Sequence, residues 1–113
     1  MTTPHPRERL HEAGHRARTK RAKEFALFLY RVYRRQGRTP LVAMQMVYSA
    51  TRGVAEDVSL PDGLRAEAAM QCYYASRYFN QINRRLFTPA GPYWVIGRQI
   101  DWVAAADALH WGD

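Results

Sequence analysis

The chain has 113 residues and a formal net charge of +7, and this length leaves room for one domain with one hydrophobic core. No apolar run approaches the roughly 20 residues that span a bilayer, and the cationic stretch 16–23 lies where a signal peptide would be apolar. The single cysteine, Cys72, has no partner for an internal disulfide. We therefore expect a cytoplasmic protein that does not associate with membranes.

Positive charge is concentrated in the first third of the chain. Residues 1–38 contain eleven Lys or Arg against three Glu, a net charge of +8, whereas the remaining 75 residues contain six Arg against seven acids, a net charge of −1. A field of this kind attracts a polyanion, and nucleic acid is the usual polyanion of the cytoplasm. Fifteen of the seventeen basic residues are Arg, whose planar guanidinium suits phosphate, although a GC-rich genome gives the same bias.

The N-terminal part of the chain predicts a short tail followed by a long helix. Pro4 and Pro6 oppose regular structure, so we expect a flexible tail over 1–6 and a single helical domain over 7–113. Helical spacing of apolar residues predicts a helix over about 8–36 that ends at Gly37. The inward face of this helix is expected to comprise Ala22, Phe25, Ala26, Leu29, Val32 and Tyr33.

Three further helices are expected. Thr39 as N-cap and Pro40 at the first helical position begin a second helix, over about 41–50, that lacks a polar face and is expected to be buried on most sides, by its neighbours or by a partner. A third helix over about 64–86 would turn inward Leu64, Ala68, Cys72, Ala75, Phe79, Ile82 and Leu86. A final helix over about 93–111 would turn Ile96, Ile100 and Val103 to one side.

No long alternation of period two appears, so nothing predicts a sheet. The predicted fold class is all-α, a compact bundle of about four helices with a long basic N-terminal helix.

The first candidate site is the basic face of the first helix. On a helical wheel, the side opposite Phe25 and Leu29 carries Lys20, Lys23, Leu27, Tyr30, Arg31, Arg34 and Arg38. A charged helix face is commonly only solvated, but a helix that is merely soluble mixes Glu among its cations. Exposed Leu27 and Tyr30 among cations also favour docking or base stacking.

The second candidate site is a polar stripe on the third helix. Tyr73, Arg77, Asn80, Gln81 and Arg84 share one side of it, and Tyr74, Tyr78 and Arg85 form a neighbouring line. Such a ladder holds successive phosphates while the rings contact sugars or bases. The alternative is that the tyrosines are core rings and the arginines complement the helix C-terminus. The predicted nucleic-acid-binding residues are Arg16, Arg18, Lys20, Arg21, Lys23, Arg31, Arg34, Arg35, Arg38, Tyr73, Arg77, Arg84 and Arg85.

The segment 11–15 (His-Glu-Ala-Gly-His) matches the H-E-x-x-H pattern and resembles that of zinc metallopeptidases. That resemblance implies His11 and His15 as ligands and Glu12 as the base. The following residues, however, are cationic where an active-site helix would be apolar, and a third ligand could come only from scattered carboxylates such as Glu56 or Glu67. We expect two exposed histidines, no metal or other cofactor, and no catalytic activity.

A helix-turn-helix regulator is one interpretation of a basic helical chain, and the junction 36–40 offers the turn. The helix that follows it is too apolar to read base edges. In size, helical architecture and charge the whole chain resembles the small helical subunits of multi-subunit (class 1, type IV included) CRISPR effector complexes.

That resemblance implies a non-catalytic, sequence-independent subunit of a ribonucleoprotein that lines a positive groove for a target or displaced strand. The partners would be RNA or single-stranded DNA backbone, other subunits, and copies of itself. A phage- or plasmid-type DNA-binding regulator is the alternative.

Overall fold

The computed structural model describes residues 6–87 and 100–111, with side chains for 16–85 and 100–111. These residues form four α-helices and, within the described ranges, no strand: α1 (Pro6–Arg35), α2 (Pro40–Glu56), α3 (Asp62–Phe87) and α4 (Trp102–Ala108). The all-α prediction is confirmed. No helix in the described part of the chain is long and apolar enough to cross a membrane.

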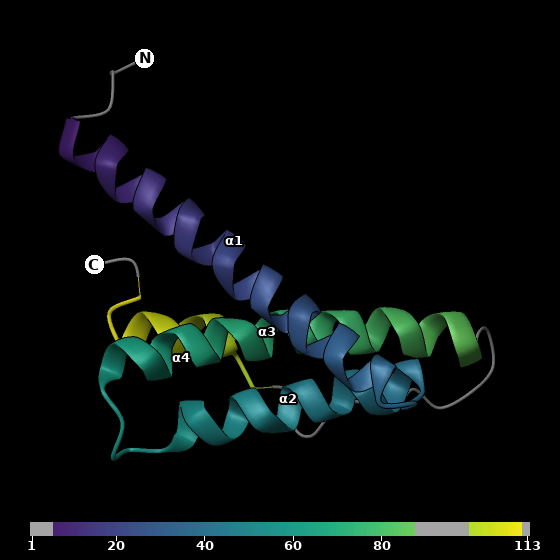
Figure 1. The fold of residues 1–113 in the computed structure, drawn as a ribbon. Helices are drawn as coiled ribbons and strands as arrows, with labels where there is room; N and C mark the ends of the chain where they lie inside the picture. The colour runs from purple at the N-terminus through teal and green to yellow at the C-terminus, as the bar shows by residue number, and fades with distance from the viewer. Residues whose placement is uncertain (1–5, 88–99, 112–113) are drawn as a thin grey trace.

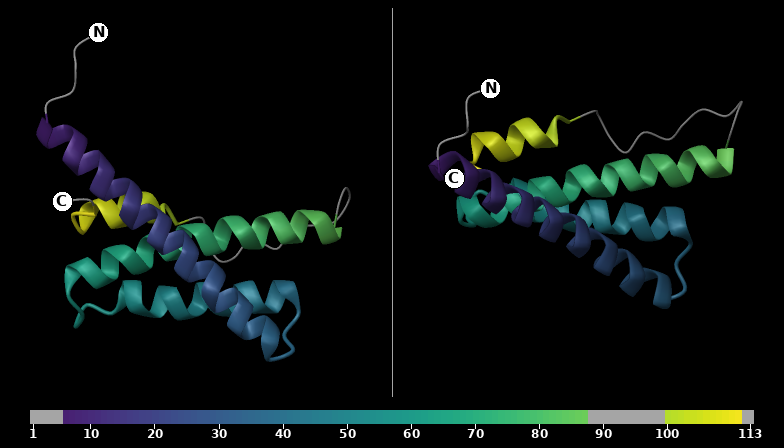
Figure 2. Two further views of the ribbon diagram at one scale, coloured as in Figure 1. Left: turned by 45° about the horizontal axis from the view of Figure 1, so that its top comes forward. Right: turned by 90° about the horizontal axis from the view of Figure 1, so that it is seen from above.

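The helices α2 and α3 form an antiparallel hairpin, and α1 runs diagonally across it (Figure 1). In the view from above in Figure 2, the C-terminal half of α1 and the helix α4 lie on opposite sides of α3. The N-terminal part of α1 extends beyond the hairpin in all views. One end of the molecule holds three helix ends: the end of α1, the start of α2 and the end of α3 (Figure 1).

The junction between α1 and α2 follows the sequence prediction. Gly37 has φ 86°, and the Arg38 amide donates to the Tyr33 carbonyl at 3.3 Å, which closes α1 with a Schellman motif. The Thr39 hydroxyl then accepts from the Val42 amide at 3.4 Å, and Pro40 occupies the first turn of α2. These four residues reverse the chain so that α1 and α2 can pack together.

Alanine makes up much of the core. The larger buried apolar side chains are Met44, Val47, Tyr48, Met70, Cys72, Phe79, Trp102 and Trp111, with Met44 1% and Val47 0% exposed. Small side chains let helix backbones approach closely, so that backbone atoms occupy much of the interior. The buried alanines are Ala22, Ala26, Ala43, Ala55, Ala66, Ala68, Ala69, Ala75 and Ala106.

The predicted inward face of α1 is confirmed except at Phe25, and Leu29 and Tyr33 pack against the core as expected. Ala22 and Ala26 are buried as expected, but Phe25 is 40% exposed, and the next aromatic residue, Phe28, is 54% exposed. Tyr30, predicted to stand among exposed cations, is half-buried against the core. The partner helices meet the alanine side of α1, because small residues permit the close approach that phenylalanine would block.

Two further burial predictions also need correction. The hairpin partner covers only one side of α2, and Val42 and Val54 on its other side are 41% and 38% exposed. On α3, Cys72 and Phe79 are buried as predicted, but Leu64 is 52% exposed because it lies in the first turn, at the edge of the bundle.

The C-terminal helix is shorter than predicted. Residues 93–99, where its start was expected, lie outside the described residues, and Ile100 and Asp101 are not helical. The Asp101 carboxylate accepts from the Ala104 amide at 3.0 Å and thereby caps α4. Trp102 and Ala106 form its buried side, whereas Val103, predicted to face inward, is 37% exposed.

Burial keeps Cys72 protonated. The side chain is fully buried, its thiol donates to the Thr51 hydroxyl at 3.2 Å, and desolvation raises the pKa of Cys72 from 9.0 to about 12. The unfolded chain loses this proton above pH 9.0 and the folded chain does not, so the free energy of unfolding falls as pH rises from 9.0 toward 12, by about 1.4 kcal/mol per pH unit from this group. Urea unfolding at several alkaline pH values measures the slope. In Cys72→Ala the slope should be shallower; equal slopes would contradict this cause.

His110 occupies a position that favours glycine. Its φ is 62°, and the Trp111 amide donates to the Ala106 carbonyl at 3.0 Å, so His110 is the left-handed residue of the Schellman motif that closes α4. A side chain at this φ costs about 1–2 kcal/mol. We expect His110→Gly to unfold at higher urea concentration than His110→Ala, by about 1 kcal/mol in free energy of unfolding. Both variants lack the imidazole, so their difference isolates the backbone; identical stabilities would contradict the strain.

Candidate functional site

Charge is segregated along the molecule. The described segments 25–55 and 68–87 contain no Asp or Glu. Because α1 and α3 both end at the same end of the bundle (Figure 1), their arginines gather there. We call the basic end the four arginines at this end that do not lie on the outer side of α1: Arg34, Arg38, Arg84 and Arg85.

No carboxylate among the described residues pairs with the basic end. The ion pairs lie elsewhere: Lys20 with Glu24 at 3.9 Å, Arg52 with Glu56 at 2.8 Å, and Arg65 with Asp62 at 3.7 Å. The cations of the basic end are solvent-exposed, so their charge is available to a ligand. Arg34 is held in place, since its guanidinium donates to the Arg38 carbonyl at 2.7 Å.

A groove of about 200 Å³ opens between α1 and α3 beside the basic end. Leu27 and Tyr30 line it from α1, and Tyr78 and Arg85 line it from α3. The remaining lining residues are Met44, Gln81 and Ile82. The groove thus joins the two faces that the sequence predicted separately.

A row of aromatic rings follows α3 toward this groove. The rings of Tyr74 and Tyr78 are stacked, with centroids 6.4 Å apart and planes at 29°, and Tyr73 meets Tyr74 edge-on at 5.2 Å. Arg77 donates to the Tyr73 hydroxyl at 3.1 Å, with its guanidinium carbon 5.6 Å from the Tyr73 ring centroid. These contacts fix the orientation of the Arg77 fork before any ligand arrives.

Two tyrosines of this row, Tyr74 and Tyr78, remain neutral hydrogen-bond donors. Desolvation raises the pKa of both Tyr74 and Tyr78 above 10.0. The positive charge of Lys23 on α1 opposes this shift and lowers the pKa of Tyr74. Lys23 lies one helical turn before Leu27, on the side of α1 that lines the groove.

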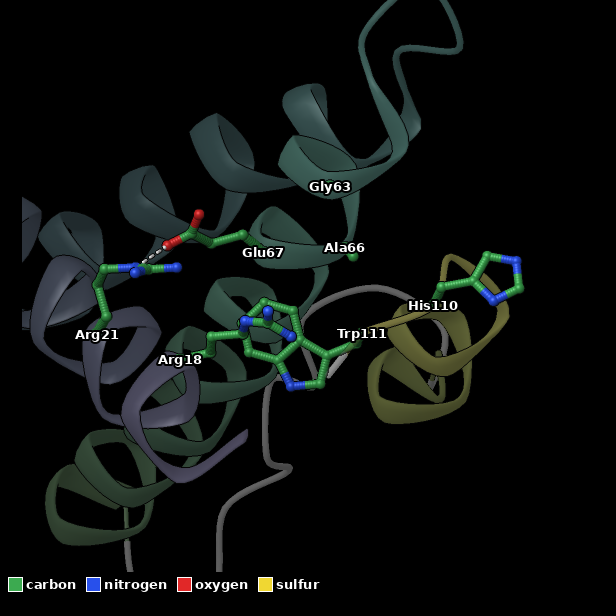
Figure 3. A pocket seen from close by; sticks show the side chains of 7 residues that line it. All are labelled: Arg18, Arg21, Gly63, Ala66, Glu67, His110 and Trp111. Atoms are coloured by element: carbon green, nitrogen blue, oxygen red, sulfur yellow. Dashed lines mark hydrogen bonds and ion pairs between the residues drawn. The ribbon is translucent and has the colours of Figure 1, made fainter. Parts of the chain in front are cut away.

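The remaining predicted site residues on α1 are not part of this groove. Arg18 and Arg21 line a separate pocket of about 310 Å³, together with Glu67, His110 and Trp111 (Figure 3). The Arg21 guanidinium binds the Glu67 carboxylate at 2.8 Å, which offsets its charge. These two cations are thus separated from the groove.

The outer side of α1 holds a third set of cations. Arg31 and Arg35 lie opposite the buried Ala22 and Ala26 in the helical repeat, and Arg16 is exposed near the N-terminal limit of the described side chains. Lys20 forms its pair with Glu24 on the same helix. Four of the thirteen predicted residues lie at the groove or in the aromatic row or adjoin them. These residues are Lys23, Tyr73, Arg77 and Arg85.

Sequence analysis did not predict that Tyr30, Tyr78 and Met44 line the same groove. Leu27 and Tyr30 stood out as apolar residues among cations, and both line the groove, but the residues across from them depend on how α1 crosses α3. Gln81 belonged to the predicted stripe and is found on the rim.

The described residues contain no group of three or more His, Cys, Asp or Glu that could hold a metal ion. The backbone of 11–15 belongs to α1, and its side chains lie outside the described residues. The two carboxylates considered as a third zinc ligand, Glu56 and Glu67, are bound by Arg52 and Arg21.

Comparison of the chain with known protein families, with curated proteins and with solved structures finds no match.

Proposed function

We propose that the protein binds the sugar–phosphate backbone of nucleic acid without reading its sequence and without catalysis. The observation that carries this proposal is the basic end, where four exposed arginines lie at one end of the bundle and the segments 25–55 and 68–87 contribute no carboxylate. Arginine forks bind phosphate oxygens in pairs, and their number suits a strand rather than a single small anion. The groove and its tyrosines adjoin this surface.

We further propose that the protein acts as a subunit of a ribonucleoprotein, similar in size, helical architecture and charge to the small subunits of multi-subunit CRISPR effector complexes. Exposed apolar side chains outside the groove support a role in an assembly. Phe25 and Phe28 lie together on α1, with ring centroids 6.4 Å apart, and Val42 and Val54 are exposed on α2. Apolar groups that remain exposed in one chain are typical of surfaces that contact other chains.

Fluorescence anisotropy with random single strands and random duplexes, over a range of salt concentrations, tests backbone binding. We expect a dissociation constant of about 10⁻⁴–10⁻⁶ M near physiological salt, similar for unrelated sequences of one length. The logarithm of the association constant should fall linearly with the logarithm of salt concentration, by about 0.7 for each phosphate contacted on a single strand. Absence of binding at low salt would refute the proposal, and a strong preference for one duplex sequence would favour a DNA-binding regulator.

A further inference from the structure

We infer that the groove between α1 and α3 takes one unstacked base of a single strand whose phosphates lie on the basic end. This inference rests on the proposed function and adds a specific site and a preference for single strands. Its basis is the combination, within one groove, of apolar and aromatic walls with a cationic, carboxylate-free rim.

The interior of the groove is suited to a flat, weakly polar group. Leu27 and Met44 supply aliphatic surface, and the half-buried rings of Tyr30 and Tyr78 supply aromatic surface. A base has such a face, and stacking on aromatic side chains is the usual way in which proteins hold bases of single strands. Met44 is 1% exposed, so the floor of the groove is part of the core and does not need to form on binding.

The rim supplies the polar partners that a nucleotide requires. Gln81 is exposed at the edge, and its amide offers both a donor and an acceptor to a base edge. The Arg85 guanidinium stands beside it and can bind the adjoining phosphate.

The charge around the groove selects the class of ligand. Lys23 lies one helical turn before Leu27 on the same side of α1, and Arg85 lines the groove from α3. The segments of α1, α2 and α3 that line the groove contain no Asp or Glu. A ligand that combines an apolar planar group with a nearby anion therefore fits better than a neutral apolar peptide. Bases in a duplex are already stacked and paired, so only a single strand can supply a base without the cost of unstacking.

The test compares two strands of equal length and charge, oligothymidylate and the corresponding abasic deoxyribose-phosphate strand, by fluorescence anisotropy at one salt concentration. We expect the abasic strand to bind roughly 5- to 150-fold more weakly, because stacking of one base contributes about 1–3 kcal/mol. If neither strand binds, the proposed function fails together with this inference. If both bind equally well and with equal salt dependence, backbone binding stands and the inference is overturned.

Leu27→Trp tests the location, because its indole would fill the groove. The matched control is Phe28→Trp, which places the same side chain on the next residue of α1, where Phe28 is exposed outside the groove. We expect Leu27→Trp to lower the affinity for oligothymidylate to the level of the abasic strand and Phe28→Trp to leave it unchanged. Retention of the base-dependent affinity in a folded Leu27→Trp variant would overturn the inference.

Gln81→Ala gives a second test that does not disturb the core, because Gln81 is exposed. This substitution should weaken binding of oligothymidylate several-fold and leave binding of the abasic strand unaffected.

An acidic peptide with interspersed leucines is the competing occupant of the groove. A peptide site would bind this peptide more tightly than polyglutamate, and Leu27→Trp would abolish the difference. If oligothymidylate and the abasic strand also bind alike, the groove is a peptide site and the inference is wrong.

Discussion

Charge reversal at both Lys23 and Arg85 is expected to weaken binding of a random single strand at least tenfold. Arg85 lines the groove from α3, and Lys23 lies one helical turn before Leu27 on the side of α1 that lines the groove. Each reversal removes one phosphate contact and adds a repulsive charge. The slope of the logarithm of affinity against the logarithm of salt concentration should also decrease by about 1–2.

The matched control is Arg31→Glu with Arg35→Glu. This pair changes the net charge by the same amount, from +7 to +3, but lies on the outer side of α1. We expect a smaller loss of affinity from the control, since its cations act on a strand in the groove only at a distance and are screened by salt. Equal losses from the two double variants would mean that the whole cationic surface attracts the strand and that the groove has no special part. Circular dichroism verifies that both variants are folded.

Replacement of Trp102 by alanine is expected to lower the free energy of unfolding by about 3–5 kcal/mol. Trp102 is 6% exposed, and its ring meets the ring of Tyr48 edge-on at 6.0 Å and 77°. It is the largest side chain on the buried side of α4, so its removal leaves a cavity between this helix and the hairpin. A loss of this size is a large share of the 5–15 kcal/mol typical of a domain.

The adjacent residue provides the control for this prediction. Val103 is 37% exposed, and Val103→Ala should change the free energy of unfolding by less than about 0.5 kcal/mol. Urea denaturation followed by circular dichroism measures both variants. Similar small effects from both would show that α4 contributes little to the stability of the bundle.

The helix boundaries that the sequence predicted well are those with local chemical signals. Gly37, Thr39 and Pro40 act through their own backbone and side-chain preferences, and they place the end of α1 and the start of α2 correctly. The sequence analysis did not single out Asp101, which caps α4, and predicted a longer helix that began before it.

The face of α1 was harder to predict because burial depends on the partner. Phe25 and Ala26 are adjacent, and both fit an apolar stripe, so hydrophobicity alone favours the larger side chain as the buried one. The structure buries Ala26, because α1 crosses the hairpin closely. The same crossing decides which cations of α1 reach α3. The sequence could therefore predict the residue types of the site but not their division between the groove and the pocket near Glu67.

An interior composed so largely of alanine has a consequence for how the molecule responds to ligands. Methyl groups remove little apolar area from water, and hydrophobic stabilisation scales with that area at about 25 cal/mol per Å². The unbound chain should accordingly have a low melting temperature for its size. A bound polyanion would raise that temperature in proportion to the logarithm of its concentration, so that thermal shift measurements become a sensitive screen for what the protein binds.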